Sequence, residues 1–194
     1  MTLNKLNLPA MGQLGIIVKS IDRSIPYYAD VMNIRPWYRT NIVEEEIYYK
    51  DRRIDLELDV VIGYSGSLQF ELIQVVRGEE NIYTELINTR GEGLHHVGFI
   101  VANIKKKTEM LRGAGFTPIQ HGFLKTKGNA LTRFAYFDTM ETYGYILELI
   151  ETTLLGIPVG MSRQMIKLGR LLGDVEVFYP SNADKINSLS DDSK

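Results

Sequence analysis

Apolar side chains occur along this chain in short runs with the periodicity of β-strands, and two of these runs resemble each other. Residues 13–19 and residues 95–101 are largely apolar and rich in β-branched side chains, which is typical of buried strands. A helix is expected after each run, over about residues 23–32 and 104–112, because a helix-capping side chain precedes each segment and Asn or Gly follows it. The order strand then helix therefore occurs twice.

The strands that follow each helix also correspond. Residues 54–62 alternate apolar and acidic side chains, and residues 68–76 form a second strand pattern after a Gly-rich turn. The second half has strand patterns at residues 131–137 and 145–151, again separated by a turn. Similar elements in the same order indicate an internal duplication, although chance similarity of apolar strands is the alternative.

Aligning the two halves pairs four polar residues that lie inside apolar strands. Gln13 falls on His96 in the first strands, and Glu71 falls on Glu148 in the last strands. The sequences around the glutamates, Phe-Glu-Leu-Ile and Leu-Glu-Leu-Ile, are nearly the same, and the spacing between the paired positions is similar in both halves. The duplication thus places a polar residue at corresponding points of both halves.

The pattern divides the chain into segments. A C-terminal stretch has no counterpart in the first half, contains an amphipathic helix near residues 161–172 and ends in a polar run. The predicted segments are a first module at 11–77, a linker at 78–93, a second module at 94–153, a C-terminal helical extension at 154–180 and a disordered tail at 181–194.

Composition excludes several classes of function. The 194 residues include 22 basic and 24 acidic side chains, so neither nucleic acid nor an anionic membrane is an expected partner. Without cysteine there is no disulfide, thiolate metal site or cysteine nucleophile. No apolar run approaches the roughly 20 residues that span a bilayer. A cytoplasmic location is expected.

The four aligned residues have the chemistry of a metal site. A carboxylate on a buried face is costly unless it is paired or binds a metal, although each glutamate taken alone could also point to solvent. Two carboxylates (Glu71 and Glu148), one imidazole (His96) and one amide oxygen (Gln13) suit one divalent ion such as Zn²⁺, Ni²⁺, Co²⁺ or Mn²⁺. His95 should point to the opposite face from His96 because neighbouring strand residues alternate.

Other residues are weaker candidates. Arg133 and Lys125 could meet an anionic part of a substrate, although surface cations are common. Trp37 and Tyr49 could line a pocket, and core packing explains them equally well. The run Glu44, Glu45 and Glu46 is interpreted as a charged, solvated turn, with a second catalytic base as the alternative.

The chain resembles the vicinal oxygen chelate superfamily, the group of glyoxalases, bleomycin-resistance proteins and extradiol dioxygenases. The resemblance covers about residues 11–152 and is carried by Gln-Leu-Gly-Ile-Ile-Val at 13–18, His-Val-Gly-Phe-Ile-Val at 96–101 and the two Glu-Leu-Ile sequences. It implies an α+β fold in which two paired βαβββ modules form a cupped mixed sheet around a metal. The strands are most similar to the methylmalonyl-CoA epimerase-like branch, which usually has histidine where Gln13 stands.

The resemblance also implies a function. The set glutamine, glutamate, histidine, glutamate is similar to that of eukaryotic-type glyoxalase I, so the implied activity is a metal-dependent lyase or isomerase. It would transfer a proton beside a metal-bound carbonyl through an enediolate or enolate, with Glu148 or alternatively Glu71 as the base. The alternatives are a metal-free binding or resistance protein and, less favoured because Gln13 replaces a histidine, an extradiol dioxygenase. A small-molecule substrate and a homodimer are expected.

Overall fold

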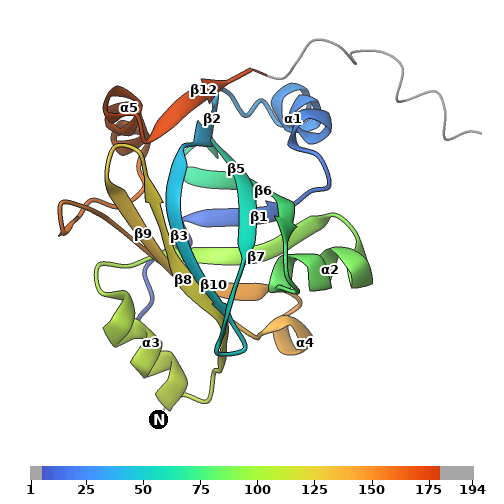
Figure 1. Ribbon diagram of the computed structural model, residues 1–194, viewed down its shortest axis with the longest axis vertical. Helices are drawn as coiled ribbons and strands as arrows, with labels where there is room; N and C mark the ends of the chain where they lie inside the picture. The colour runs from blue at the N-terminus through green and yellow to red at the C-terminus, as the bar shows by residue number, and fades with distance from the viewer. Residues whose placement is uncertain (1–5, 180–194) are drawn as a thin grey trace, which may run out of the picture.

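Both halves of the chain contribute strands to one strongly curved mixed sheet (Figure 1). The computed structural model describes residues 6–179, and within them the sheet has twelve strands. The strands are β1 (Gln13–Ile17), β2 (Trp37–Thr40), β3 (Ile42–Tyr49), β4 (Arg52–Ile54), β5 (Leu56–Ser65), β6 (Leu68–Gly78), β7 (Gly93–Ile100), β8 (Pro118–Thr126), β9 (Ala130–Phe137), β10 (Ile146–Leu154), β11 (Ile157–Pro158) and β12 (Val175–Phe178). The helices are α1 (Ile21–Asp30), α2 (Ile82–Arg90), α3 (Ile104–Gly113), α4 (Met140–Tyr143) and α5 (Arg163–Leu172).

The centre of the sheet has an approximate two-fold arrangement. β1 and β7 lie side by side and antiparallel, and each is flanked by a parallel partner, β6 next to β1 and β10 next to β7. The order outward is β6, β5, β2 on one side and β10, β9, β8 on the other. The predicted α+β fold with a cupped mixed sheet is therefore confirmed, and the two halves pair within one chain.

β3 connects the two halves at the open side of the sheet. It leaves β2 through Asn41 and pairs with β8 of the second half. Figure 1 shows β3 crossing in front of β5, β6, β1 and β7, so the sheet curls into a cup. The interpretation of Glu44, Glu45 and Glu46 as a turn is wrong, because all three lie in β3 and pair with β8. The module boundaries at 11–77 and 94–153 stay a prediction.

Two helices cover the outer face of the sheet. α1 begins at Ser20, whose side chain accepts a hydrogen bond from the Arg23 N–H, and buries Ile21, Ile25 and Ala29. This spacing of four residues places the three side chains on one helix face. α3 is capped in the same way by Asn103 and packs against β9 and β10.

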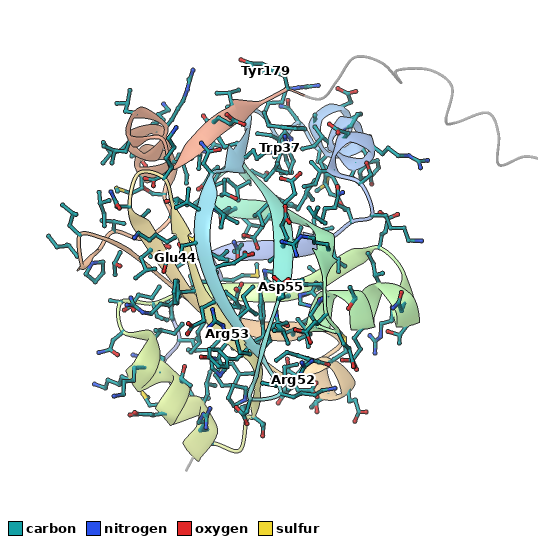
Figure 2. All side chains as sticks on the ribbon, viewed as in Figure 1. Trp37, Glu44, Arg52, Arg53, Asp55 and Tyr179 are labelled. Atoms are coloured by element: carbon teal, nitrogen blue, oxygen red, sulfur yellow. The ribbon has the colours of Figure 1, made fainter. Side chains whose placement is uncertain are left out.

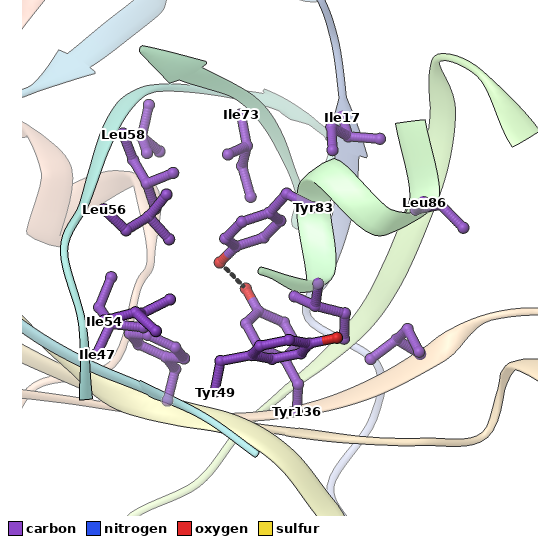
Figure 3. Close-up of a cluster of buried hydrophobic side chains, with 14 of the residues drawn as sticks. Ile17, Ile47, Tyr49, Ile54, Leu56, Leu58, Ile73, Tyr83, Leu86 and Tyr136 are labelled. Carbon is purple, nitrogen blue, oxygen red and sulfur yellow. Dashed lines mark hydrogen bonds between the residues drawn. The ribbon is translucent and has the colours of Figure 1, made fainter. Parts of the chain in front are cut away.

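The inside of the cup holds the largest cluster of buried apolar side chains (Figure 3). α2, which lies within the predicted linker 78–93, inserts Ile82, Tyr83 and Leu86 into this cluster. The hydroxyl of Tyr83 donates to the hydroxyl of Tyr136 on β9 at 3.0 Å (Figure 3). α2 therefore closes the cup from one side with packed aromatic side chains.

The C-terminal extension folds back onto the cup. α5 begins at Ser162, which accepts from the Met165 N–H, and ends at Gly173 in the left-handed region. β12 then pairs with β2. The helix thus corresponds to the one predicted at 161–172, whereas the tail predicted at 181–194 lies outside the described residues. Among the described helices, none has the length and apolar character required to cross a membrane.

Candidate metal centre

Four polar side chains from the central strands converge inside the cup. Nε2 of His96 on β7 lies 3.0 Å from Oε2 of Glu148 on β10 and 3.4 Å from Oε2 of Glu71 on β6. It also lies 3.4 Å from Oε1 of Gln13 on β1. His96, Gln13 and Glu148 are buried, and the side chain of Glu71 is 15% exposed. The structure therefore brings together all four residues that the alignment of the two halves paired.

Two glycines make this convergence possible. Gly15 is the strand partner of His96, and Gly98 is the strand partner of Gln13. A Cβ atom added to Gly15 would lie 1.8 Å from Cε1 of His96, and one added to Gly98 would lie 2.7 Å from Oε1 of Gln13. Each polar side chain therefore occupies the space that a side chain on the neighbouring strand would need.

A chain of hydrogen bonds orients the amide of Gln13. Its Nε2 donates to Oε1 of Gln69 at 2.7 Å, and Nε2 of Gln69 donates to the hydroxyl of Tyr64 at 2.7 Å. The hydroxyl of Tyr64 donates to the carbonyl of Met161 at 3.0 Å. A carbonyl can only accept, so the direction of every bond in the chain is determined. The oxygen of Gln13 is consequently the atom presented to His96.

His95 lies on the same side of the sheet as His96, and the prediction that it faces away is wrong. The β1–β7 register shifts between the pairs Gly15–His96 and Ile16–Leu94, which leaves His95 as the extra residue of a β-bulge. A bulge breaks the strict alternation of side chains and re-aims them. Nδ1 of His95 comes to lie 3.0 Å from Nδ1 of His96.

Burial and charge shift the pKa values in the cluster. Burial lowers the pKa of His96, but the carboxylates of Glu148 and then Glu71 outweigh it and raise its pKa to about 9. Burial raises the pKa of Glu148 despite the opposing effect of His96. Burial, together with the charge on His96, lowers the pKa of His95 well below its ordinary value. A neutral His95 can accept a hydrogen bond from the Nδ1–H of His96. Nε2 of His96 is then directed at the carboxylates.

The residues present fit a divalent metal ion. Ligand atoms at about 2.1 Å from one ion lie about 3.0 to 3.4 Å apart, which matches the three distances from Nε2 of His96. Oε2 of Glu148 is buried and has no hydrogen-bond partner. A bound cation would supply the partner that this oxygen lacks. Among the described residues, Glu71, His96 and Glu148 form the one cluster of this kind.

The chain matches the model of a known protein family. A model described as Glyoxalase/Bleomycin resistance protein/Dioxygenase superfamily matches residues 12–136, which include three of the four converging residues. The chain belongs to this superfamily. The resemblance noted from the sequence is therefore confirmed, and the cluster lies where the two central strand pairs of the superfamily fold meet. A search of curated proteins finds no match.

Solved structures share the superfamily fold at low identity. Methylmalonyl-CoA epimerase from Mycobacterium tuberculosis is 18% identical with a TM-score of 0.52, over 77% of this chain and 91% of that chain. A Streptomyces coelicolor methylmalonyl-CoA epimerase variant in complex with 2-nitronate-propionyl-CoA is 14% identical with a TM-score of 0.53, over 79% and 99%. A hypothetical protein from Bacillus halodurans is 20% identical with a TM-score of 0.50, over 72% and 91%. These likenesses support the fold.

The structure does not bring the predicted substrate-binding residues to the cluster. Arg133 and Lys125 line an open groove on the outer face of β8, β9 and β10, where Lys125 pairs with Glu44 at 3.4 Å. Trp37, the first residue of β2, is buried against α1 (Figure 2). Tyr49 points into the inner core, but its hydroxyl donates to Glu85 on α2. Their contacts with a substrate stay a prediction.

Sequence reasoning also missed residues that support the cluster. Gln69 and Tyr64 orient Gln13, and Tyr136 packs its ring 5.1 Å from that of His96. Gln69 was detectable in principle, because it precedes Glu71 by two positions and so shares its strand face. Tyr64 had no comparable signal, since its role depends on the carbonyl of Met161, which is far away in the sequence.

Proposed function

We propose that this protein is a metal-dependent lyase or isomerase that moves a proton on the carbon beside a carbonyl group. The observation that carries the proposal is the buried convergence of Glu71, His96, Glu148 and the oriented oxygen of Gln13. Two carboxylates balance the charge of a divalent cation, while the imidazole and amide add donors without charge. The metal would be Zn²⁺, Ni²⁺, Co²⁺ or Mn²⁺.

Each residue has a role in this proposal. His96, Gln13 and Glu71 hold the cation, with Glu148 as the remaining ligand. When bound, a divalent cation supplies a Lewis acid that stabilises negative charge on a substrate oxygen. Glu148 also takes the proton from the substrate carbon and returns it, with Glu71 as the alternative base. Its burial raises the pKa of the carboxyl and so makes Glu148 a stronger base than an exposed carboxylate.

The surroundings of the cluster exclude bulk water. The cavity beside Glu71 and Glu148 measures about 30 Å³ and is lined mostly by apolar and aromatic side chains, among them Leu58, Phe134 and Tyr136. A low-dielectric site strengthens interactions between charged groups and the reacting atoms. The charges of Glu71 and Glu148 therefore act strongly on atoms bound beside them.

Two substrate classes agree with this chemistry. Hemithioacetals of 2-oxoaldehydes and 2-branched acyl thioesters both carry an acidic hydrogen on the carbon beside a carbonyl group. The structures of the epimerases contain methylmalonyl-CoA or 2-nitronate-propionyl-CoA, and this makes branched acyl-CoA thioesters the first substrates to test.

The test combines metal content with proton exchange. Protein purified without chelator should contain close to one divalent ion per chain, and loaded protein should exchange the substrate hydrogen with deuterium from solvent, as followed by NMR. Glu148→Gln should slow this exchange by about 100-fold or more, the usual contribution of a general base. Glu151→Gln, on the outward face of the same strand beside Arg133, is the matched control and should retain full activity.

The alternatives are distinguishable outcomes. A protein that binds no divalent metal, and whose ligand binding is unchanged in Gln13→Ala and His96→Ala, would be a metal-free binding protein. Oxygen consumption with a catechol and iron would identify a dioxygenase. The expected homodimer and cytoplasmic location remain predictions.

A further inference from the structure

A second cavity lies beneath α5, at the side of the cup opposite α2. It measures about 80 Å³ and lies between α5 and the strands β10 and β12. Its walls are mainly apolar and include Ile62, Met165, Ile166, Leu168 and Val175. Helix α5 therefore covers an internal space without filling it.

The hydroxyl groups in the walls of this cavity form hydrogen bonds within the protein. The hydroxyl of Thr40 donates to a backbone carbonyl at 3.0 Å, and the hydroxyls of Thr132 and Thr152 bond each other at 3.0 Å. Asp174 accepts from the hydroxyl of Thr126. Oδ1 of Asp174 also accepts from the N–H of Ala130 at 3.2 Å. A space of this kind holds apolar groups in preference to water.

Two side chains separate this cavity from the candidate metal centre. Met161 and Thr132 line both the cavity under α5 and the smaller cavity beside Glu71 and Glu148. Met161 is held by its backbone, because its carbonyl accepts from Tyr64. Its thioether side chain is unbranched and adapts readily to a neighbouring group. A shift of the Met161 side chain would therefore join the two cavities.

We propose that the cavity under α5 binds an aliphatic chain of the substrate, whose carbonyl end lies at the metal centre. This inference rests on the proposed function and narrows its substrate class to carbonyl compounds that carry, beyond the reacting carbon, an unbranched apolar chain. A cavity of 150 Å³ accommodates benzene, so the volume of about 80 Å³ takes a chain of about three or four carbons.

The pocket is a feature of this chain's own extension. The residues that roof it from α5 and the preceding loop, Met161, Met165, Ile166 and Leu168 among them, lie after residue 136, where the match to the superfamily model ends. The wall hydroxyls make their hydrogen bonds within the protein, and the one charged wall residue is the acidic Asp174, so the pocket favours an uncharged apolar chain over an anionic one. Selection would therefore depend on length and apolar character.

The test measures how binding depends on chain length. Straight-chain hydroxamates from acetohydroxamate to octanohydroxamate are titrated calorimetrically into zinc-loaded protein. Affinity should rise about fourfold for each added methylene, corresponding to about 0.8 kcal/mol, and stop rising once the pocket is full. An affinity that does not change along the series would overturn the proposal.

Variants locate the effect. Ile166→Trp, and as a second version Met165→Trp, fill the pocket and should abolish the dependence of hydroxamate affinity on chain length. Leu171→Trp is the control, because Leu171 lies on the same helix and is 84% exposed. If the pocket-filling variants keep the full dependence on chain length, the chain binds elsewhere and the proposal is wrong.

A metal-free measurement separates the two proposals. With methyl-labelled methionine, 1-butanol added to metal-free protein should shift the NMR signals of Met161 and Met165 saturably, but not that of Met32, which is 42% exposed on the outer surface. If zinc does not bind but these shifts occur, the proposed function fails and an apolar pocket remains. If zinc and acetohydroxamate bind but neither the shifts nor the chain-length effect occurs, the pocket fails alone.

Discussion

The imidazole of His96 lies directly over Gly15 of the neighbouring strand, so close that a Cβ at Gly15 would be 1.8 Å from Cε1 of the ring. Gln13 stands in the corresponding relation to Gly98. In each half of the chain the candidate ligand precedes its glycine by two residues, and antiparallel pairing of β1 with β7 places each ligand opposite the glycine of the other half. The two halves thus make room for each other's ligand.

Gly15→Ala should abolish tight metal binding. The new Cβ must displace the His96 ring, and the ring is enclosed by His95, Tyr136 and the carboxylates and has no free space to enter. We expect metal affinity to fall by more than about 100-fold, with some loss of thermal stability from overpacking. Competition with a fluorescent chelator measures the affinity.

Gly12→Ala is the control for this prediction. A Cβ at Gly12 meets only the side chain of Ile100, at 2.8 Å from its terminal Cδ1, and a flexible methyl can move. Metal affinity should stay within a few-fold of the unaltered protein. Equal losses in both variants would show that the effect comes from general damage to the strand and not from displacement of His96.

Tyr64→Phe should weaken metal binding without touching a ligand. The phenol hydroxyl links the carbonyl of Met161 to Gln69, and Gln69 fixes the amide of Gln13. Without it, the two amides can rotate and present nitrogen to the cation. Loss of such a supporting hydrogen bond typically costs about 10-fold to 100-fold in metal affinity. Tyr38→Phe removes a hydroxyl from another buried tyrosine of the inner core and should leave the affinity unchanged.

His95 should act on metal binding through the tautomer of His96. A histidine that offers Nε2 to a cation carries its proton on Nδ1, and Nδ1 of His95 is 3.0 Å away to accept it. His95→Leu should therefore lower metal affinity by about 10-fold or more, whereas His95→Asn, whose side-chain oxygen can accept in the same place, should restore most of it. If the two variants bind metal equally, His95 has only a packing role.

Glu45 should make the protein less stable at alkaline than at acidic pH. Burial, followed by the charges of Glu57 and Asp55, raises its pKa from 4.5 to about 6. Because the pKa of Glu45 is higher in the folded protein than in the unfolded chain, its contribution to stability is complete below pH 4.5. This contribution is lost as the pH rises through about 6. Because Glu45 is only partly buried, solvent screening reduces the effect to about 1 kcal/mol, or about 3 °C in Tm.

The experiment compares Glu45→Gln with the unaltered protein at two pH values. The substitution should raise Tm by about 3 °C near pH 8 and change it little near pH 4, as measured by differential scanning calorimetry. Glu44→Gln is the control and should not raise Tm near pH 8, because Glu44 lies on the exposed face of the same strand and pairs with Lys125. A Glu45→Gln effect of equal size at both pH values would contradict the burial argument.

Several features of this protein follow from the sequence alone. Period-two strands, capped helices and the repeated Glu-Leu-Ile sequences determine two similar halves, because local patterns of apolar residues select secondary structure and its order. The pairing of Gln13 with His96 and of Glu71 with Glu148 also comes from the repeat, and the cupped sheet brings these four residues to one point.

Only the tertiary structure decided the rest. The bulge that turns His95 toward His96, the hydrogen-bond chain from Gln13 to Met161 and the pairing of β3 with β8 all join residues distant in the sequence or depend on strand register. Arg133 and Lys125 face outward because the strand phase of β8 and β9 is set by packing against the inner core. Local sequence carries no record of such contacts, since register and sheet curvature are chosen by the burial of the whole apolar set.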